Sequence, residues 1–273
     1  MGKRIELTRE QQDQIIYNYT VLKWSRKRSG AFIPVSDGVV KRILEENNIH
    51  VKTLYETNIN KFNVKHDYFK NQTSDMGYWI GILGSDGCVA SQSNQIYIEL
   101  QRQDKELLEK LNLSIQNERP VKDYITGKGY ENSKIYFYSK EIKKDLSTFH
   151  IIPNKTYSDK YDFPELLNKE FYPDYIRGLF DGDGCIKQTE GHSPCWQIDL
   201  GKESIALKII DIFKEQNIKI NYTYMPKKNV TLTRIYSYGK NTLQQIYNYL
   251  YFTGSNLFLK RKKDKIEEIL KMK

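Results

Sequence analysis

The sequence lacks the features of membrane proteins, disulfide-rich secreted proteins and histidine-based nucleases. Its mean hydropathy is −0.67, and no apolar run is long enough to span a membrane. It has only 3 cysteines, an odd number whose spacing fits no zinc cage, so we expect no disulfide framework and a reducing compartment. The 4 histidines are scattered and form no HNH pattern. Because the N-terminal segment is polar, without the apolar core of a secretory signal, we expect an intracellular protein of a bacterial or phage-infected cytoplasm or an organelle matrix.

Positive charge and tyrosine are abundant instead. The 273 residues include 43 Lys and Arg against 34 Asp and Glu, a formal net charge of +9, and 21 tyrosines. Excess positive charge favours a polyanionic partner, and tyrosine beside lysine or arginine suits nucleic acid. A gene of high AT content would enrich lysine and tyrosine as well. Composition therefore supports nucleic-acid binding and a codon bias about equally.

Residues 1–60 are expected to form a small helical unit. Thr8 can cap a helix over residues 9–19, and Ser36 can cap a second helix over residues 37–47. A basic connector lies between these helices. The unit resembles the helix-turn-helix of site-specific recombinases and small regulators.

The second helix of this unit places Lys41 and Arg42 on its exposed face, where they are candidate DNA contacts. The alternative is a helical hairpin that only packs on its neighbour. Residues 61–73 are polar and are expected to form a linker to the remainder of the chain.

Beyond the linker, helical segments alternate with short strands. Residues 96–100 and 196–200 alternate apolar and polar side chains, which predicts strands with one buried face. Residues 135–138 and 230–234 are further expected strands.

A 12-residue segment occurs twice. Residues 78–89 match residues 175–186, and similar elements follow each copy. The repeat predicts an α+β fold of two pseudo-symmetric halves, residues 74–160 and 161–273. Each half has the order helix-strand-strand-helix-strand-strand-helix, with antiparallel sheets.

Small residues lie four positions apart in each copy, at Gly81 and Ser85 and at Gly178 and Gly182. Residues at this spacing share one helical face, so two such helices can approach each other very closely. The repeat therefore predicts a tight contact between the two motif helices.

Each motif helix is expected to end in an acid, Asp86 or Asp183. Gly87 and Gly184 are expected to end the helices in a left-handed cap. Because the macrodipole is negative at a helix C-terminus, two carboxylates brought together there need a cation. Carboxylate and carbonyl oxygens favour a hard divalent metal. The alternative, an ordinary Asp-Gly turn, explains one copy better than two.

The two motifs resemble the LAGLIDADG signature of homing endonucleases, in the form that carries both motifs in one chain. The nine signature positions fall on residues 79–87 and 176–184, and the resemblance covers about residues 74–273. The sixth position, usually acidic in the family, is Gly84 in the first motif and Asp181 in the second.

The resemblance implies a metal site at the motif ends. The family's metal-binding acid occupies the eighth position, here Asp86 and Asp183. The preceding backbone carbonyls, at Ser85 and Gly182, are further expected ligands of Mg²⁺ or Mn²⁺. No small-molecule cofactor is expected.

The family also places a lysine near each scissile phosphate. The candidates are Lys155 and Lys260, which lie at similar distances in sequence beyond their acids. Arg261 competes with Lys260, which itself belongs to a basic run typical of a solvated helix.

The implied protein is a monomeric homing endonuclease that spreads an intron. Its two sheets would form a saddle on double-stranded DNA, and it would cut both strands of a long, non-palindromic site to leave short 3′ overhangs. Gln101, Gln103 and Lys202 are also candidates for positioning water. The expected DNA contacts of the sheets are Tyr97, Glu99, Gln101, Gln103, Tyr136, Tyr138, Gln197, Asp199, Lys202, Lys227, Lys228, Thr233 and Arg234.

Two other functions fit the same fold. A maturase would bind intron RNA and promote splicing, and a transcription regulator would bind DNA without cutting it. Such regulators have commonly lost the motif acids, and this chain keeps both Asp86 and Asp183. Endonuclease activity is therefore the favoured prediction.

Overall fold

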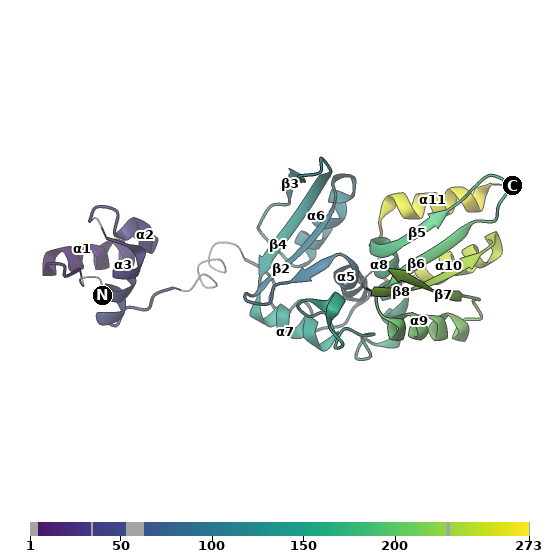
Figure 1. Cartoon of the computed structure of the whole chain (residues 1–273), viewed down its shortest axis with the longest axis horizontal. Helices are drawn as coiled ribbons and strands as arrows, with labels where there is room; N and C mark the ends of the chain where they lie inside the picture. Colours follow the sequence, from purple (N-terminus) through teal and green to yellow (C-terminus); the bar gives the residue numbers. More distant parts are fainter. Residues whose placement is uncertain (1–4, 34, 53–62, 228–229, 273) are drawn as a thin grey trace. The chain divides into compact units, whose positions relative to one another are not determined.

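Figure 1 shows the computed structural model of the chain, which describes residues 5–33, 35–52, 63–227 and 230–272. The chain divides into two compact units, Met1–Thr57 and Asn58–Lys273. The first unit is helical, and the second combines helices with sheets. No helix in the described ranges has the length and apolar content that crossing a bilayer requires.

The described part of the first unit has three helices, α1 (Arg9–Thr20), α2 (Arg26–Ser29) and α3 (Asp37–Glu46). Thr8 caps α1 in a reciprocal capping box with Gln11, which satisfies two backbone donors at the helix start. Both helices expected from the sequence are confirmed. Ser36 stands at the N-cap position of α3 as expected, but its side chain makes no capping hydrogen bond. α1, α3 and the turn that follows α2 enclose a small core of Ile15, Ile33, Val40, Ile43 and Leu44.

The second unit contains the repeated architecture. Its first half consists of α5 (Ser74–Ser85), β1 (Gly87–Val89), β2 (Gln95–Gln101), the 3-10 helix η1 (Arg102–Asp104), α6 (Lys105–Ser114), β3 (Lys122–Ile125), β4 (Glu131–Tyr138) and α7 (Lys140–Thr148). Two short 3-10 helices, η2 (Lys155–Tyr157) and η3 (Lys169–Phe171), lead to the second half. That half consists of α8 (Tyr172–Asp183), β5 (Gly184–Lys187), β6 (Cys195–Leu200), α9 (Glu203–Glu215), β7 (Asn221–Lys227), β8 (Val230–Tyr238), α10 (Lys240–Tyr251) and α11 (Lys260–Lys271).

Each half forms one four-stranded antiparallel sheet. The strand orders are β1-β2-β4-β3 and β5-β6-β8-β7, and in Figure 1 α5 and α8 lie between the two sheets. The registers correspond as well, since Tyr97 pairs with Tyr136 in the first sheet and Gln197 pairs with Tyr236 in the second. The predicted α+β fold with two pseudo-symmetric halves is therefore confirmed.

One face of each sheet is covered by helices, and the other face is open. In β2, Ile96, Ile98 and Leu100 are buried, whereas Tyr97 and Glu99 on the opposite face are partly exposed. α6 packs against β2 and β4, and α9 packs against β6 and β8. The alternation expected for this strand is confirmed. Burying an isoleucine or leucine side chain completely stabilises the fold by roughly 1.5–3 kcal/mol.

The segment before α5 packs onto the first half from Asn63 onward. Phe69 is buried in the core, and the backbone N–H of Lys65 donates to the carbonyl of Ile115 at 2.7 Å. Thr73 then caps α5 through its side-chain oxygen. Of the range expected as a linker, residues 61 and 62 lie outside the described residues, and residues 63–73 belong to the folded unit.

Candidate functional site

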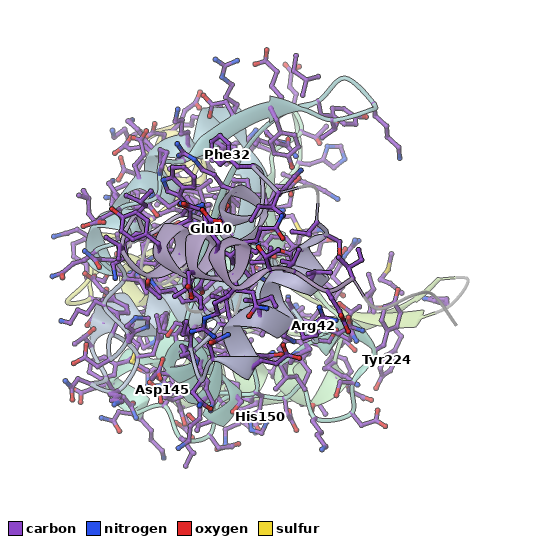
Figure 2. All side chains as sticks on the ribbon, turned by 90° about the vertical axis from the view of Figure 1, so that its left-hand side faces the viewer. Glu10, Phe32, Arg42, Asp145, His150 and Tyr224 are labelled. Carbon is purple, nitrogen blue, oxygen red and sulfur yellow. The ribbon has the colours of Figure 1, made fainter. Side chains whose placement is uncertain are left out.

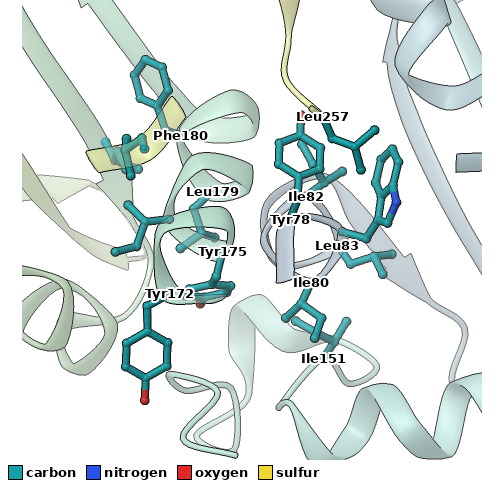
Figure 3. Packing of buried hydrophobic residues seen from close by; sticks show 14 of the residues in the cluster. Tyr78, Ile80, Ile82, Leu83, Ile151, Tyr172, Tyr175, Leu179, Phe180 and Leu257 are labelled. Atoms are coloured by element: carbon teal, nitrogen blue, oxygen red, sulfur yellow. The ribbon is translucent and has the colours of Figure 1, made fainter. Parts of the chain in front are cut away.

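The motif helices α5 and α8 pack backbone against backbone at their glycines. A Cβ atom on Gly81 would lie 2.2 Å from the carbonyl oxygen of Tyr175 and 2.8 Å from Cα of Gly178. A Cβ atom on Gly178 would lie 2.3 Å from the carbonyl oxygen of Tyr78. Because these distances leave no space for a side chain, the expected tight contact is confirmed. Figure 3 shows Tyr78 and Tyr175 among the buried side chains around it.

The motif helices end differently from the expectation of left-handed caps. Gly184 has φ −82° and ψ 163°, and neither Gly87 nor Gly184 has a positive φ. Each helix instead continues directly into a strand, β1 or β5. A Cβ atom on Gly87 would lie 2.6 Å from the carbonyl oxygen of Leu83, and one on Gly184 would lie 2.4 Å from that of Phe180. Glycine is needed here because the new strand lies against the last helical turn.

Asp86 and Asp183 stand at these helix ends, as expected. Asp86 is the C-cap residue of α5, and Asp183 is the last residue of α8. Burial and the nearby Asp183 carboxylate raise the pKa of Asp86 from 3.8 to about 6. Partial removal from water also raises the pKa of Asp183, although part of this residue's surface remains exposed. The two carboxylates thus add negative charge to helix ends whose dipole is already negative.

Lys155 lies beside both acids. Its Nζ donates a hydrogen bond to the carbonyl oxygen of Gly87, directly after the first motif helix. Burial lowers the pKa of this lysine, while Cys88, Asp183 and Asp86 act in the opposite direction. The structure therefore brings together the first-half lysine and the acids that the family resemblance implies.

Lys262 is the corresponding cation from the second half, and sequence reasoning missed it. Its buried Nζ donates to the carbonyl oxygens of Phe180 (2.7 Å), Asp181 (2.6 Å) and Gly182 (3.2 Å). Burial lowers its pKa to about 8, partly offset by Asp181 and the two motif acids. The ammonium group thus satisfies the carbonyls at the end of α8 and sits within the field of the acids.

Lys260, the lysine expected in this position, does not reach the acids. It is 74% exposed and pairs with Asp264 at 2.6 Å on the surface of α11. The reason is helical periodicity: Lys262, Ile266 and Ile269 share the buried face of α11, and Lys260 faces away from it. The positions of the two isoleucines were the sequence signal that could have identified Lys262.

Arg261 also takes a different role from the one considered for it. Its Nε and Nη2 donate to the carboxylate of Asp104 in the first half, at 3.0 to 3.1 Å. Both residues line a cleft of about 750 Å³ that also includes Asp86, Gly182 and Gln101. This ion pair joins the two halves at the edge of the acid site.

The sixth motif position differs between the halves for a steric reason. Asp181 is buried and accepts hydrogen bonds from Tyr78 Oη and the backbone N–H of Leu259, both at 2.8 Å. In the first motif, the Tyr161 hydroxyl donates to the carbonyl of Gly84 at 2.9 Å, and a Cβ atom on Gly84 would lie 3.1 Å from this hydroxyl. Tyr161 therefore occupies the space that an acid would need.

The donors near the acids are suited to a hard cation. Among the described residues, no group of three or more His, Cys, Asp and Glu side chains could hold a metal. Asp86 and Asp183 can combine with the carbonyls of Ser85 and Gly182, although Gly182 already accepts a bond from Lys262. Mg²⁺ is often bound by one or two carboxylates together with substrate phosphates, so this oxygen-only set fits it.

Most predicted DNA contacts of the first sheet share its open face. The cross-strand pairs place Tyr97, Glu99, Gln101, Tyr136 and Tyr138 there. Gln103 follows in η1 and donates to Gln101 at 2.7 Å. These side chains form a continuous polar and aromatic surface.

The second sheet carries fewer of its predicted contacts. Asp199 and Arg234 face each other on the open side, but Gln197 is only 7% exposed. Thr233 is 2% exposed and lies on the covered face with Ile235, so its expected DNA contact is wrong. The reason is the strand register, which puts odd-numbered residues of β8 against the helices.

The remaining predicted contacts of this half are three lysines. Lys202 precedes α9 and pairs with Asp159 at 3.5 Å. Lys227 ends β7, but its side chain is outside the described part of the molecule, as is Lys228 entirely.

The exposed face of α3 in the first unit is mixed in charge, and not basic as expected. Lys41 is exposed and pairs with Glu45 at 3.6 Å. Arg42 donates to the carbonyl of Ile5 at 2.6 Å and pairs with Glu46 at 3.8 Å. Separately, Figure 2 shows Phe32 on this unit, with 77% of its surface exposed.

The fold and the paired acids define a class of protein, two-half α+β chains with one acid-ended motif helix in each half. No family model matches this chain. The uncharacterized protein MJ0314 of Methanocaldococcus jannaschii is 24% identical over 151 residues, 54% of either chain. The chain therefore spans about half the length of the curated relative that it matches.

Solved structures of three proteins are similar to part of this chain. The LAGLIDADG meganuclease I-AabMI bound to uncleaved DNA is 12% identical with a TM-score of 0.45, covering 70% of this chain and 87% of its own. The I-LtrWI LAGLIDADG homing endonuclease bound to target DNA is 12% identical with a TM-score of 0.46, covering 76% and 91%. Full-length DUF199/WhiA from Thermatoga maritima is 15% identical with a TM-score of 0.44, covering 76% and 64%.

Proposed function

We propose that this chain is a site-specific DNA endonuclease that makes a metal-dependent double-strand break. The proposal is carried by the convergence of Asp86, Asp183, Lys155 and Lys262 at the paired ends of α5 and α8. The two helices are pseudo-symmetric, so each DNA strand would meet one acid and one lysine. Because both motifs lie in one chain, a monomer would suffice.

The acids would hold Mg²⁺ or Mn²⁺ together with the carbonyls of Ser85 and Gly182. When bound, the ion would lower the pKa of a water molecule and neutralise the leaving oxyanion. The raised pKa values of Asp86 and Asp183 support this role, because crowded carboxylates gain most from a nearby cation.

The lysines would act on the DNA and on the acids. Lys155 and Lys262 would stabilise the negative charge that develops on the scissile phosphates. Lys262 has a second role, since its bonds to three carbonyls hold the turn of α8 that carries Asp183. It would thus position this acid as well as offset its charge.

The open sheet faces would bind double-stranded DNA on either side of the cut. A two-stranded ribbon fits the major groove, where every base pair presents a distinct donor and acceptor pattern. The net charge of +9 favours this polyanion. Because the two sheets carry different side chains, the target would be long and non-palindromic.

The test is a search for cleavage by the full chain. Supercoiled plasmids with randomised inserts are incubated with the protein and Mg²⁺ or Mn²⁺, and newly formed ends are captured and sequenced. We expect ends at one short family of sequences with 3′ overhangs, and no ends when a chelator is present. The Asp86→Asn, Asp183→Asn double variant should be inactive, whereas Asp211→Asn, an exposed acid of α9, should cut normally.

Other outcomes would identify the alternatives. Sequence-specific binding of duplex DNA without cleavage in either metal would contradict the endonuclease and favour a regulator. Preferential binding of a structured intron RNA would favour a maturase.

A further inference from the structure

Among the described side chains, each sheet carries an acid–base pair on its open face at the same position of the register. Glu99 faces Lys134 between β2 and β4, and Asp199 faces Arg234 between β6 and β8. The pairs differ in geometry. The Lys134 Nζ lies 3.8 Å from Glu99 Oε2 and 3.7 Å from the ring centroid of Tyr97. The pair in the second sheet is shorter and has two hydrogen bonds.

Asp199 engages one edge of the Arg234 guanidinium. Nε donates to Asp199 Oδ1 at 2.6 Å, and Nη2 donates to Oδ2 at 2.7 Å. Among the described residues, Nη1 of Arg234 has no hydrogen-bond acceptor, and 24% of the side chain remains exposed. A guanidinium has five N–H donors in a fixed plane, so the end of the fork, Nη1 with the second N–H of Nη2, is left for a ligand.

The Arg234 guanidinium, fixed by its two hydrogen bonds to Asp199, is suited to bind the edge of a base. Its two outward donors match O6 and N7 of guanine, the most frequent specific contact of arginine in the major groove. A phosphate contact fits poorly, because the Asp199 carboxylate cancels the charge of the pair and repels a phosphate. Fixing the side chain in advance also reduces the entropy lost when DNA binds.

The inference rests on the proposed function, since it requires the second sheet to lie in a DNA groove. We propose that Arg234 reads a guanine in the half-site bound by this sheet, and that Asp199 positions Arg234 for this contact. Lys134 lacks a planar fork and presents a point charge, so the first sheet imposes no comparable discrimination at its equivalent position.

The test measures binding without cleavage. Duplex DNA is selected from a random library by the full chain in chelator, and the dissociation constant is then measured for each base at every selected position. We expect one position in one half-site where replacing guanine weakens wild-type binding about ten- to hundredfold. Arg234→Ala should bind all four bases there within about twofold. Arg234→Lys, whose ammonium group can still donate to guanine without a planar fork, should discriminate less than the wild type. Lys134→Ala should keep the discrimination.

Asp199→Ala separates positioning from contact. Without the carboxylate, discrimination for guanine should fall to a few-fold, while binding of unrelated DNA tightens because a negative charge is lost. Melting temperatures establish that each variant folds, and Arg234→Lys retains the charge if Arg234→Ala is unstable. Full guanine discrimination in Arg234→Ala would overturn the contact, and full discrimination in Asp199→Ala would overturn the positioning role.

The outcomes also distinguish this inference from the proposed function. A wild-type chain that selects and cuts one site, with base preferences that no Arg234 variant changes, would contradict only the guanine contact. A wild-type chain that selects no duplex sequence would overturn both.

Discussion

Lys262 is the side chain whose loss should affect both stability and the acid site. Replacing it by methionine removes the donor for three carbonyls at the end of α8. Because buried acceptors left without partners are costly, we expect the free energy of unfolding to fall by about 2–4 kcal/mol. Urea denaturation measures this change. Lys260→Met, on the exposed side of the same helix, should change it by less than about 0.5 kcal/mol, and equal losses in both variants would contradict the assignment.

Asp86 should destabilise the metal-free protein at neutral pH. Its folded-state pKa of about 6 exceeds the ordinary 3.8, so the native state binds the proton more tightly than the unfolded state does. Protonation of Asp86 therefore stabilises the folded state. This stabilisation is complete below about pH 4 and is lost as the pH rises through about 6. We therefore expect Asp86→Asn, measured in chelator at pH 8, to be about 1–3 kcal/mol more stable than the wild type.

The pH dependence of this difference is the control. The advantage of Asp86→Asn should shrink as the pH falls from 7 towards 4, and adding Mg²⁺ should raise the melting temperature of the wild type more than that of the variant. An advantage that is constant over this pH range would show that charge at Asp86 is not its source.

The contact between α5 and α8 should tolerate no added side chain. In Gly178→Ala, the new methyl group would lie 2.3 Å from the carbonyl oxygen of Tyr78, which belongs to backbone and must move. We expect a loss of about 1–3 kcal/mol or more in the free energy of unfolding. Gly201→Ala is the matched control, because no described residue other than its chain neighbours has an atom within 4 Å of its added Cβ. Similar melting temperatures for the two variants would contradict the close packing of the helices.

The elements were predictable where the signal is local. The capping residue Thr8, the alternation of β2 and the small residues of the motif helices depend on neighbours in sequence, and all were identified correctly. Lys262 and Thr233 were misjudged because their environment depends on which face of an element the tertiary fold covers. The glycine after each motif helix was recognised. Glycine is required there because a side chain would collide with the preceding helical turn, and not because the residue has a left-handed φ angle.

The site could be predicted only in part for the same reason. The two acids were identified because the repeat marks them twice in the sequence. The partner of Arg261 is Asp104, which is 157 residues away, and no local pattern links them. The pairing of Asp199 with Arg234 likewise depends on the strand register, which becomes visible only when β6 and β8 are aligned.

For the whole chain, the first unit should add DNA affinity without changing the cut. Its cations, among them Lys27 and the exposed Lys41, would contact phosphates and release counterions. We expect a chain that lacks residues 1–57 to bind the selected site more weakly, with a flatter salt dependence and a footprint shortened on one side only. The cleavage position should be unchanged. An identical footprint and salt slope would assign this unit a packing role.

The most direct measurement is strand-specific cleavage of the selected DNA site by Asp86→Asn and Asp183→Asn separately, in Mg²⁺, with the binding affinity of each measured in chelator. We predict that both variants bind the site nearly as tightly as the wild type and that neither produces a double-strand break. We also predict normal cleavage by Asp211→Asn, because Asp211 lies in α9, outside both motifs. Double-strand cleavage at the wild-type rate by either motif variant would contradict the assignment of the paired acids as the active site.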